Sequence, residues 1–362
     1  MQMPILLSIC VPTYNRAACL DLALARISHQ IKESGRQDIE VLVANNASTD
    51  NTQEIINKHK KANPYIETFT HNNNIGPDRN FISLVAAAKG RYCWIFGDDD
   101  ILMDGALLEV TGILANNADL GLLHVSGSYH TDVRDVQMKR RVTSDCCEVF
   151  IGKEAFVERI GLFITFITGN IFNRSYLQET IDVRQFAGSN VVHVAFYVQS
   201  ILKGRINIYS GVLIYSAMSD NTGGYRLFQT FGPNLDAVLS YFTPYGFKKK
   251  WIGSIQRKLC VSFFPQFIVR VRTKPSRFSS ENIAKTLLPT FRQYGAFWFF
   301  VYPLVSLPQF AREPYYRCCR MIIRSAKFFG SCRVLGGDRG SRRPGDADVR
   351  VATSKSQVTL AK

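Results

Sequence analysis

The chain has 362 residues with an ordinary globular composition, 46% hydrophobic and 20% charged, and is long enough for a large core and two domains. No run reaches the ~18 apolar residues of a membrane-spanning helix. The net charge is +15, yet residues 1–247 hold 21 basic against 24 acidic residues, whereas residues 248–362 hold 23 against 5. The positive excess therefore belongs to the C-terminal third, which favours an anionic membrane surface or a nucleic acid as its partner.

The nine cysteines indicate neither a zinc site nor a disulfide framework. They form no CxxC motif. Four of them stand next to each other in the chain, as Cys146-Cys147 and Cys318-Cys319. We therefore expect a reducing compartment. The first residues lead directly into an apolar run without a basic segment or a cleavage site, so we expect no secretory signal peptide.

Apolar runs alternate with helical patterns in the first half of the chain. The expected strands are residues 5–11, 39–44, 66–70, 92–96, 121–126 and, further on, 206–215. The expected helices are residues 16–31, 51–62, 78–89, 105–116, 153–159 and 191–202. This alternation predicts an α/β fold with a mostly parallel central sheet flanked by helices.

Polar clusters follow three of these strands, at residues 12–15, 45–50 and 98–100. The carboxyl ends of parallel strands line one rim of a sheet, where ligands of open α/β folds bind. A nucleotide site needs such a layout, with places for a base, a ribose and metal-bridged phosphates. Neither GxGxxG nor GxxxxGK[ST] is present, so neither a dinucleotide fold nor a P-loop is supported.

Three aspartates, Asp98, Asp99 and Asp100, come directly after the buried strand at 92–96 and Gly97. Adjacent carboxylates repel one another, and each has a raised pKa unless a positive charge lies between them. Mg²⁺ or Mn²⁺ is the usual partner, and these ions commonly bind substrate phosphates as well. A solvated acidic turn is the alternative for this segment taken alone.

The composition changes near residue 227. Amphipathic helices with Arg and Lys are expected at 235–242, 251–271, 292–311 and 317–329. Within them AFWFFVY at 296–302 is too short to span a bilayer, but aromatic residues beside basic ones suit a helix in a membrane interface. Packing on the first domain is the alternative. The Gly-rich segment 220–225 is either a lid or a plain connection. We divide the chain into residues 1–226, a basic aromatic helical extension at 227–330, and a disordered tail at 331–362.

Four segments resemble the family 2 glycosyltransferases of the GT-A fold. They are SICVPTYNR at 8–16, VLVANNASTDNT at 41–52, NNNIGPDRN at 72–80 and GRYCWIFGDDDIL at 90–102. Their order and spacing match the family over about the first 110 residues. The FGDDD variant, with the basic aromatic C-terminal segment, is similar to bacterial O-antigen enzymes, including abequosyltransferases.

The resemblance implies a role for each matching residue. Pro12, Thr13, Tyr14 and Asn15 are expected to surround the base, and Arg79 to neutralise the diphosphate. Asp98 and Asp99 are expected to contact the ribose and the metal, and Asp100 to support them. Asn45 stands where the family usually has an Asp that accepts the uracil N3–H. An amide both donates and accepts, so it can also match cytosine and favours a CDP-sugar. A simple loop or capping role for Asn45 is equally compatible.

The inverting members of the family carry an acidic general base about eleven residues before a helix-ending Gly. Counting back from Gly204 reaches His193. A histidine can serve as a base, since its ordinary pKa is near 6.5. A structural histidine is at least as compatible with this pattern. Asp182 or Asp220 is a further candidate, and a retaining mechanism would need no base of this kind.

The resemblance implies a metal-dependent glycosyltransferase for hexosyl or deoxyhexosyl transfer. The implied partners are a nucleotide-sugar donor, a polyprenyl-diphosphate-linked oligosaccharide acceptor and an anionic membrane surface, with no nucleic acid. We expect a cytoplasmic enzyme, peripheral on the inner face of the cell membrane. A sugar-nucleotide pyrophosphorylase is the alternative, but such enzymes carry a Gly-rich basic loop after the first strand, where this chain has PTYNRA.

Overall fold

The computed structural model describes residues 4–130, 147–217, 224–273, 278, 280–334 and 350–351. The chain divides into two compact units. The first unit comprises the described residues of Met1–Ser219, Val238–Phe247 and Asp348–Lys362, and the second those of Asp220–Ala237 and Lys248–Ala347. The boundary that we expect after residue 226 stays a prediction. Most of the segments 220–225 and 331–362 falls outside the described residues.

The first unit is built on one mixed sheet with the order β10-β7-β9-β6-β8-β4-β1-β2-β3. Its parallel half consists of β1 (Leu7–Thr13), β2 (Ile39–Asn45), β3 (Ile66–Thr70) and β4 (Tyr92–Ile95). The other strands are β5 (Ile101–Leu102), β6 (Leu120–His130), β7 (Glu148–Phe150), β8 (Asn170–Asn173), β9 (Ile206–Ala217) and β10 (Arg350–Val351). Strand β8 is antiparallel to both β4 and β6, while β6 and β9 are parallel.

All six expected strands are confirmed, and the mostly parallel α/β class with them. Sequence reasoning missed β5, β7, β8 and β10, the last within the tail that it expects to be disordered. In β8 two asparagines, a residue type depleted in strands, enclose only two apolar residues. Pairing with β4 and β6 stabilises it instead, and the Asn170 amide donates locally to the carbonyls of Phe163 at 2.9 Å and Phe166 at 2.7 Å.

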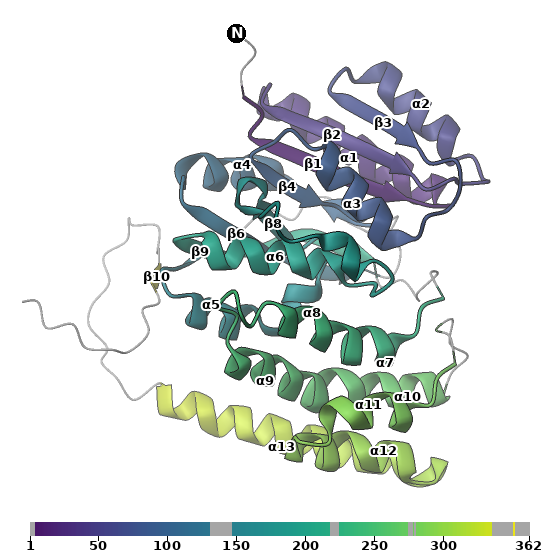
Figure 1. Ribbon diagram of the computed structural model, residues 1–362, viewed down its shortest axis with the longest axis vertical. Coiled ribbons are helices and arrows are strands. Elements are labelled where there is room, and N and C mark those ends of the chain that lie inside the picture. The colour runs from purple at the N-terminus through teal and green to yellow at the C-terminus, as the bar shows by residue number, and fades with distance from the viewer. Residues whose placement is uncertain are drawn as a thin grey trace, which may run out of the picture. The chain divides into compact units, whose positions relative to one another are not determined.

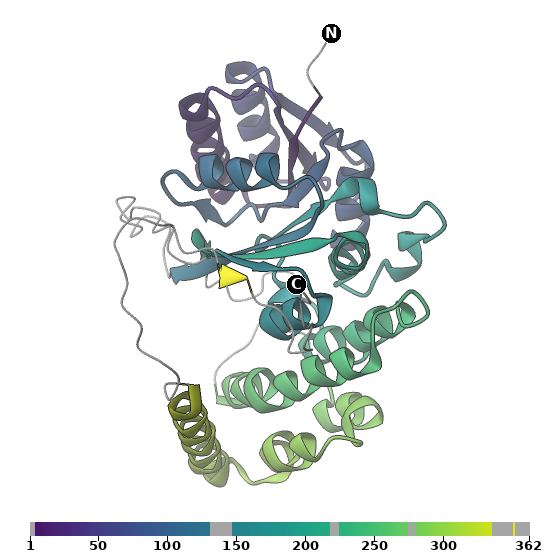
Figure 2. The same cartoon turned by 90° about the vertical axis from the view of Figure 1, so that its left-hand side faces the viewer.

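Helices lie on both faces of the sheet (Figures 1 and 2). They are α1 (Ala17–Ser34), α2 (Thr52–Ala62), α3 (Pro77–Ala87), α4 (Ala106–Asn116), α5 (Lys153–Ile160) and α6 (Val192–Lys203). Helix α1 packs against α2 and α4, whereas α3 packs on β1, β2 and α6. Short 3₁₀ turns occur at Gly161–Thr165, Arg174–Tyr176 and Val183–Phe186.

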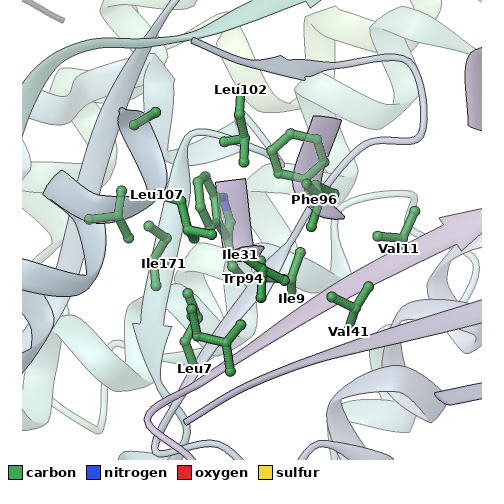
Figure 3. Packing of buried hydrophobic residues seen from close by; sticks show 14 of the residues in the cluster. Leu7, Ile9, Val11, Ile31, Val41, Trp94, Phe96, Leu102, Leu107 and Ile171 are labelled. Carbon is green, nitrogen blue, oxygen red and sulfur yellow. The ribbon is translucent and has the colours of Figure 1, made fainter. Parts of the chain in front are cut away.

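The core of the first unit lies between these helices and the sheet (Figure 3). The core includes Leu7, Ile9 and Val11, at alternate positions of β1, together with Trp94 and Phe96. All five are inaccessible to solvent. Their burial fixes the register of β1 and β4, since a one-residue slip would turn every core side chain to the other face. The polar residues that follow these strands are thereby fixed in position.

The second unit is helical. Its elements are α7 (Leu227–Gln229), a π-helical turn at Thr230–Asn234, α9 (Lys249–Lys258), a π-helical turn at Leu259–Phe263, α10 (Phe264–Thr273), α11 (Ile283–Phe291), a π-helical turn at Phe297–Val301, α12 (Tyr302–Ser306) and α13 (Gln309–Val334); α8 (Leu235–Tyr241) begins here and continues into the first unit. Helix α13 contacts α10 and α12. None of the helices in the described ranges is long and apolar enough to cross a bilayer.

The single helix expected at 292–311 is wrong. The chain turns after α11, at Arg292, and a second break separates α12 from α13 around Leu307 and Pro308. Proline lacks the N–H that a continuous helix needs, which explains the second break. The helix expected at 251–271 is confirmed, with a π-helical turn inside it.

Candidate functional site

The ends of β1, β2 and β4 meet at one edge of the sheet. Strand β1 pairs with both neighbours, so that Thr13 is the register partner of Asn45, and the Phe96 N–H donates to the Cys10 carbonyl at 2.8 Å. The structure therefore brings together the three polar segments that the sequence indicates. We call residues 13–16, 45–50 and 97–100 the carboxyl rim.

Asp98 is the most buried charged group of the carboxyl rim, at 5% exposure. Its Oδ2 accepts a hydrogen bond from Thr13 Oγ1 at 2.7 Å, and its Oδ1 lies 3.0 Å from Arg16 Nη1. The same guanidinium nitrogen lies 2.7 Å from Asp99 Oδ2. Two carboxylates therefore converge on one cationic group.

Burial raises the pKa of Asp98 to about 6. The positive charge of Arg16 opposes this effect, whereas the charge of Asp99 adds to it. With this pKa the carboxyl group is largely ionised at neutral pH, and its pKa would be higher without the positive charge of Arg16. The pair of aspartates therefore requires a cation, and in this structure Arg16 provides it.

Asp100 is bonded to a residue outside the carboxyl rim. Its Oδ1 accepts from Ser216 Oγ on β9 at 2.7 Å. Gly97 makes the turn possible, because a Cβ on this residue would come 3.0 Å from Asp100 Oδ2 and 3.1 Å from Thr168 Oγ1. Thr168 also accepts the Gly97 N–H at 2.9 Å. Sequence reasoning missed Thr168 and Ser216, since nothing near them in the chain marks them as partners of the aspartates.

The residues present suit a divalent cation in part. Among the residues that the structure describes, no group of three or more His, Cys, Asp and Glu side chains could hold a metal ion. Asp98 Oδ1 and Asp99 Oδ2, however, already face a common cation. Mg²⁺ commonly takes one or two carboxylates and completes its shell with phosphates and water, so these two oxygens are a suitable donor set.

Asn15 and Asp50 connect the loops after β1 and β2. Asn15 adopts a left-handed conformation with φ 51°, and its Oδ1 accepts the Thr49 N–H at 2.7 Å. Asp50 accepts N–H groups from Ala17 at 3.2 Å and Thr52 at 3.1 Å, which begin α1 and α2. Beside this framework Tyr14 is 43% exposed and available for stacking on a base. Pro12 lies within β1, partly buried.

Asn45 is 1% exposed, and its amide serves the loop. Its Oδ1 accepts the Ser48 N–H and its Nδ2 donates to Gln53 Oε1, both at 2.9 Å. Of the two roles that the sequence allows, this geometry supports the loop role rather than direct reading of a base. Arg79 lies exposed in the first turn of α3.

His193 lies in the first turn of α6 and is 2% exposed. Its Nε2 bonds the Thr165 carbonyl at 3.1 Å, while Nδ1 has no hydrogen-bond partner in the described part of the chain. Burial lowers its pKa to about 4. This geometry supports the structural role among the alternatives for His193. Asp182 is exposed and paired with Arg184, and Asp220 lies outside the described residues.

Asp78 is a buried carboxylate that the sequence did not single out. It accepts backbone N–H groups from Gly188 at 2.8 Å, Asn190 at 2.7 Å and Val192 at 3.3 Å. Gly188 and Asn190 have left-handed φ angles of 95° and 60°. Burial raises the pKa of Asp78, and the three N–H groups oppose that effect. Asp78 therefore fixes the loop before α6 to the start of α3.

The chain is similar in sequence to known glycosyltransferases. Residues 8–181, just under half of the chain, match the family described as glycosyl transferase family 2. Over 205 residues the chain is 32% identical to Abequosyltransferase RfbV of Salmonella typhimurium. The match covers 54% of this chain and 61% of the relative. The expected likeness to abequosyltransferases is confirmed. The chain thus spans less than two thirds of that relative.

A second relative is GalNAc(5)-diNAcBac-PP-undecaprenol beta-1,3-glucosyltransferase of Campylobacter jejuni, 32% identical over 34% of this chain and 37% of the relative. Among solved structures, S. aureus TarS 1-349 has a TM-score of 0.50 at 14% identity and covers 89% of this chain and 92% of TarS 1-349. Against the longer TarS chain the match covers 46% of that chain. At this identity the likeness concerns the fold, which is the expected GT-A fold.

Proposed function

We propose that this protein transfers a sugar from a nucleoside-diphosphate donor to a saccharide or lipid-linked acceptor. The observation that carries the proposal is the convergence of Asp98 and Asp99 on one cation at the carboxyl rim of a family 2 domain. The acceptor hydroxyl attacks the anomeric carbon, the bond to the diphosphate breaks, and the hydroxyl proton leaves to a base or to water. A pyrophosphorylase remains the alternative activity, but no contact in the site favours it.

The chief task of this site is to stabilise the negative charge that develops on the leaving diphosphate. Asp98 and Asp99 would hold Mg²⁺ or Mn²⁺, which when bound supplies positive charge to the diphosphate. Exposed Arg79 and the N-terminus of α3 are further sources of positive charge for phosphate. Asn15 and Asp50 keep the loops after β1 and β2 in register, and Tyr14 offers a surface for the base.

A nucleotide-sugar donor is also supported by the TarS relative, whose structure in complex with UDP-GlcNAc has the same fold. The base is a separate question. Because Asn45 is engaged within its own loop, the choice between CDP and UDP would rest on other groups, among them backbone groups of the rim.

We further propose a lipid-linked acceptor and peripheral attachment to the inner face of the cell membrane. The Campylobacter relative is named for an undecaprenol-linked substrate. In the second unit large apolar side chains are exposed: Trp298 at 46%, Phe299 at 49%, Phe310 at 83%, Met321 at 63% and Ile322 at 50%. Exposed Arg320 and Arg324 accompany them on α13. Aromatic and basic groups together suit the headgroup region of an anionic bilayer.

The deciding experiment is calorimetric titration of CDP, UDP, GDP and dTDP in the presence of Mn²⁺, with wild type and Asp99→Ala. Metal-dependent binding of one nucleotide, lost in the variant, is the expected result and narrows the donor. Transfer itself is then measured as release of the nucleoside diphosphate from the matching nucleotide-sugar in the presence of an acceptor. Formation of a nucleotide-sugar from a nucleoside triphosphate would instead identify a pyrophosphorylase. Failure to bind any nucleotide would overturn the proposal.

A further inference from the structure

Arg16 occupies the place where a divalent cation would meet Asp98 and Asp99. One guanidinium nitrogen, Nη1, is 3.0 Å from Asp98 Oδ1 and 2.7 Å from Asp99 Oδ2. The side chains of the three residues are 27%, 7% and 20% exposed, in the order Arg16, Asp98, Asp99. The two oxygens best placed for a metal are therefore already bonded to a cation.

The backbone of Arg16 is anchored, and its side chain is 27% exposed. The Arg16 N–H donates to Thr52 Oγ1 at 3.3 Å, and the next N–H, that of Ala17, donates to Asp50 Oδ2 at 3.2 Å. Asn15, immediately before, is fixed by its bond to Thr49. A side chain with four rotatable bonds on a fixed backbone can leave the carboxylates without any change in the fold.

We infer that Arg16 is the resident counter-ion of Asp98 and Asp99 and that it competes with the divalent cation of the donor complex for these two carboxylates. The inference deepens the proposed function and rests on it. A cation arriving alone must break both ion pairs and leave the guanidinium beside a double positive charge. A cation arriving with a diphosphate brings phosphate oxygens, which guanidinium binds well. Metal and nucleotide therefore bind cooperatively, and Arg16 passes from the carboxylates to the diphosphate.

The test measures Mn²⁺ affinity from the electron paramagnetic resonance signal of the free ion, with and without UDP or CDP. It compares the full wild-type chain with Arg16→Gln. Arg36→Gln is the matched control, because Arg36 pairs with Asp38 at 2.8 Å elsewhere in the first unit and its loss changes the charge equally. Without nucleotide, we expect Arg16→Gln to bind Mn²⁺ at least tenfold more tightly than wild type, with Arg36→Gln unchanged. The gain in Mn²⁺ affinity that nucleotide gives wild type should fall below threefold in Arg16→Gln.

A second variant, Arg16→Lys, keeps the charge but loses the planar guanidinium. It should retain weak binding of Mn²⁺ alone and lose most of the nucleotide-linked gain, and it carries the test if Arg16→Gln does not fold by circular dichroism. Equal Mn²⁺ affinities in wild type and folded Arg16→Gln without nucleotide would overturn the inference, and so would a nucleotide-linked gain in Arg16→Lys as large as that of wild type. So would the absence of Mn²⁺ binding in every protein with either nucleotide.

Failure of the inference is distinguishable from failure of the proposed function. Nucleotide binding and sugar transfer are measured on the wild type alone, in Mn²⁺ and in EDTA. Transfer together with equal Mn²⁺ affinities would reject only the competition by Arg16. Absence of nucleotide binding and transfer in the wild type would reject the function itself, whatever the Mn²⁺ affinities of the variants.

Discussion

The carboxyl rim of the first unit buries polar side chains, whereas the helices of the second unit expose large apolar side chains. At the rim, Thr13 and Asp98 are buried and bonded to each other. On the second unit, Trp298 and Phe310 are exposed. Buried polar groups are costly unless they are paired, and clustered exposed apolar groups commonly mark contact surfaces. The pairing in the first region suits the proposed sugar transfer, and the exposed apolar groups of the second suit the proposed membrane contact.

The sharpest way to break this contrast is to remove a carboxylate from the rim. Asp99→Asn should lower sugar transfer by about 10² to 10³-fold, because the negative charge that holds a cation against the diphosphate is lost. The fold should persist, since the Asp99 side chain is 20% exposed. Transfer assays at saturating nucleotide-sugar and Mn²⁺ measure the effect.

Asp119→Asn is the matched control. Asp119 is exposed, does not belong to the rim, and its Oδ2 lies 3.5 Å from Nη1 of Arg205. It should keep its activity. If Asp99→Asn retains activity within threefold of Asp119→Asn, the aspartates do not serve the chemistry.

Asp78 tests how far the site depends on a buried carboxylate that touches no proposed substrate. Asp78→Asn replaces one acceptor oxygen by an NH₂ group that faces backbone donors. We expect a loss of about 3 kcal/mol in the free energy of unfolding, measured with urea. A loss below about 1 kcal/mol would show that the loop before α6 does not need this anchor.

The aspartates of the rim and Asp78 also show what the sequence could and could not predict. Asp98 and Asp99 follow an apolar strand directly, so a local pattern placed them at the rim. Their cation, Arg16, is 82 residues from Asp98, and Asp78 meets Asn190 across 112 residues. Local periodicity contains no information on such pairings. The same limit explains β8, whose partners β4 and β6 decide its conformation.

His193 sharpens the contrast between a buried titratable group and a catalytic one. In the unfolded chain the pKa of His193 is about 6.5, whereas burial lowers it to about 4 in the folded protein. The unfolded state therefore binds more protons in this window, and stability decreases as pH falls from about 6.5 toward 4. Between pH 7 and pH 5 this group should account for about 2 kcal/mol of the loss.

His193→Phe should remove that share of the pH dependence in urea unfolding while transfer remains within tenfold of wild type. Comparing the difference between pH 7 and pH 5 in the two proteins cancels any constant cost of the substitution and the titration of other groups. A loss of transfer beyond 10²-fold at unchanged stability would instead restore His193 as the general base.

The second unit should respond to charge rather than to the chemistry of the rim. Arg320→Gln with Arg324→Gln should weaken binding to anionic liposomes by about 2 kcal/mol, roughly 30-fold, at low salt. Lys58→Gln with Lys60→Gln removes the same charge from α2 of the first unit and should have little effect. Flotation with phosphatidylglycerol vesicles measures both. Equal loss in the two double variants would show that net charge alone, and not the surface of α13, governs attachment.

The smallest effect is expected at Asn45, where the sequence allowed two roles. Asn45→Asp keeps an acceptor for the Ser48 N–H but loses the donor to Gln53, a partly buried hydrogen bond worth about 1 kcal/mol. If the residue only shapes the loop, the ratio of CDP to UDP affinity should change less than threefold, although both affinities fall slightly. A tenfold shift toward UDP, measured by calorimetry, would show that the amide reads the base directly, because a carboxylate accepts the uracil N3–H but cannot donate to the cytosine N3 acceptor.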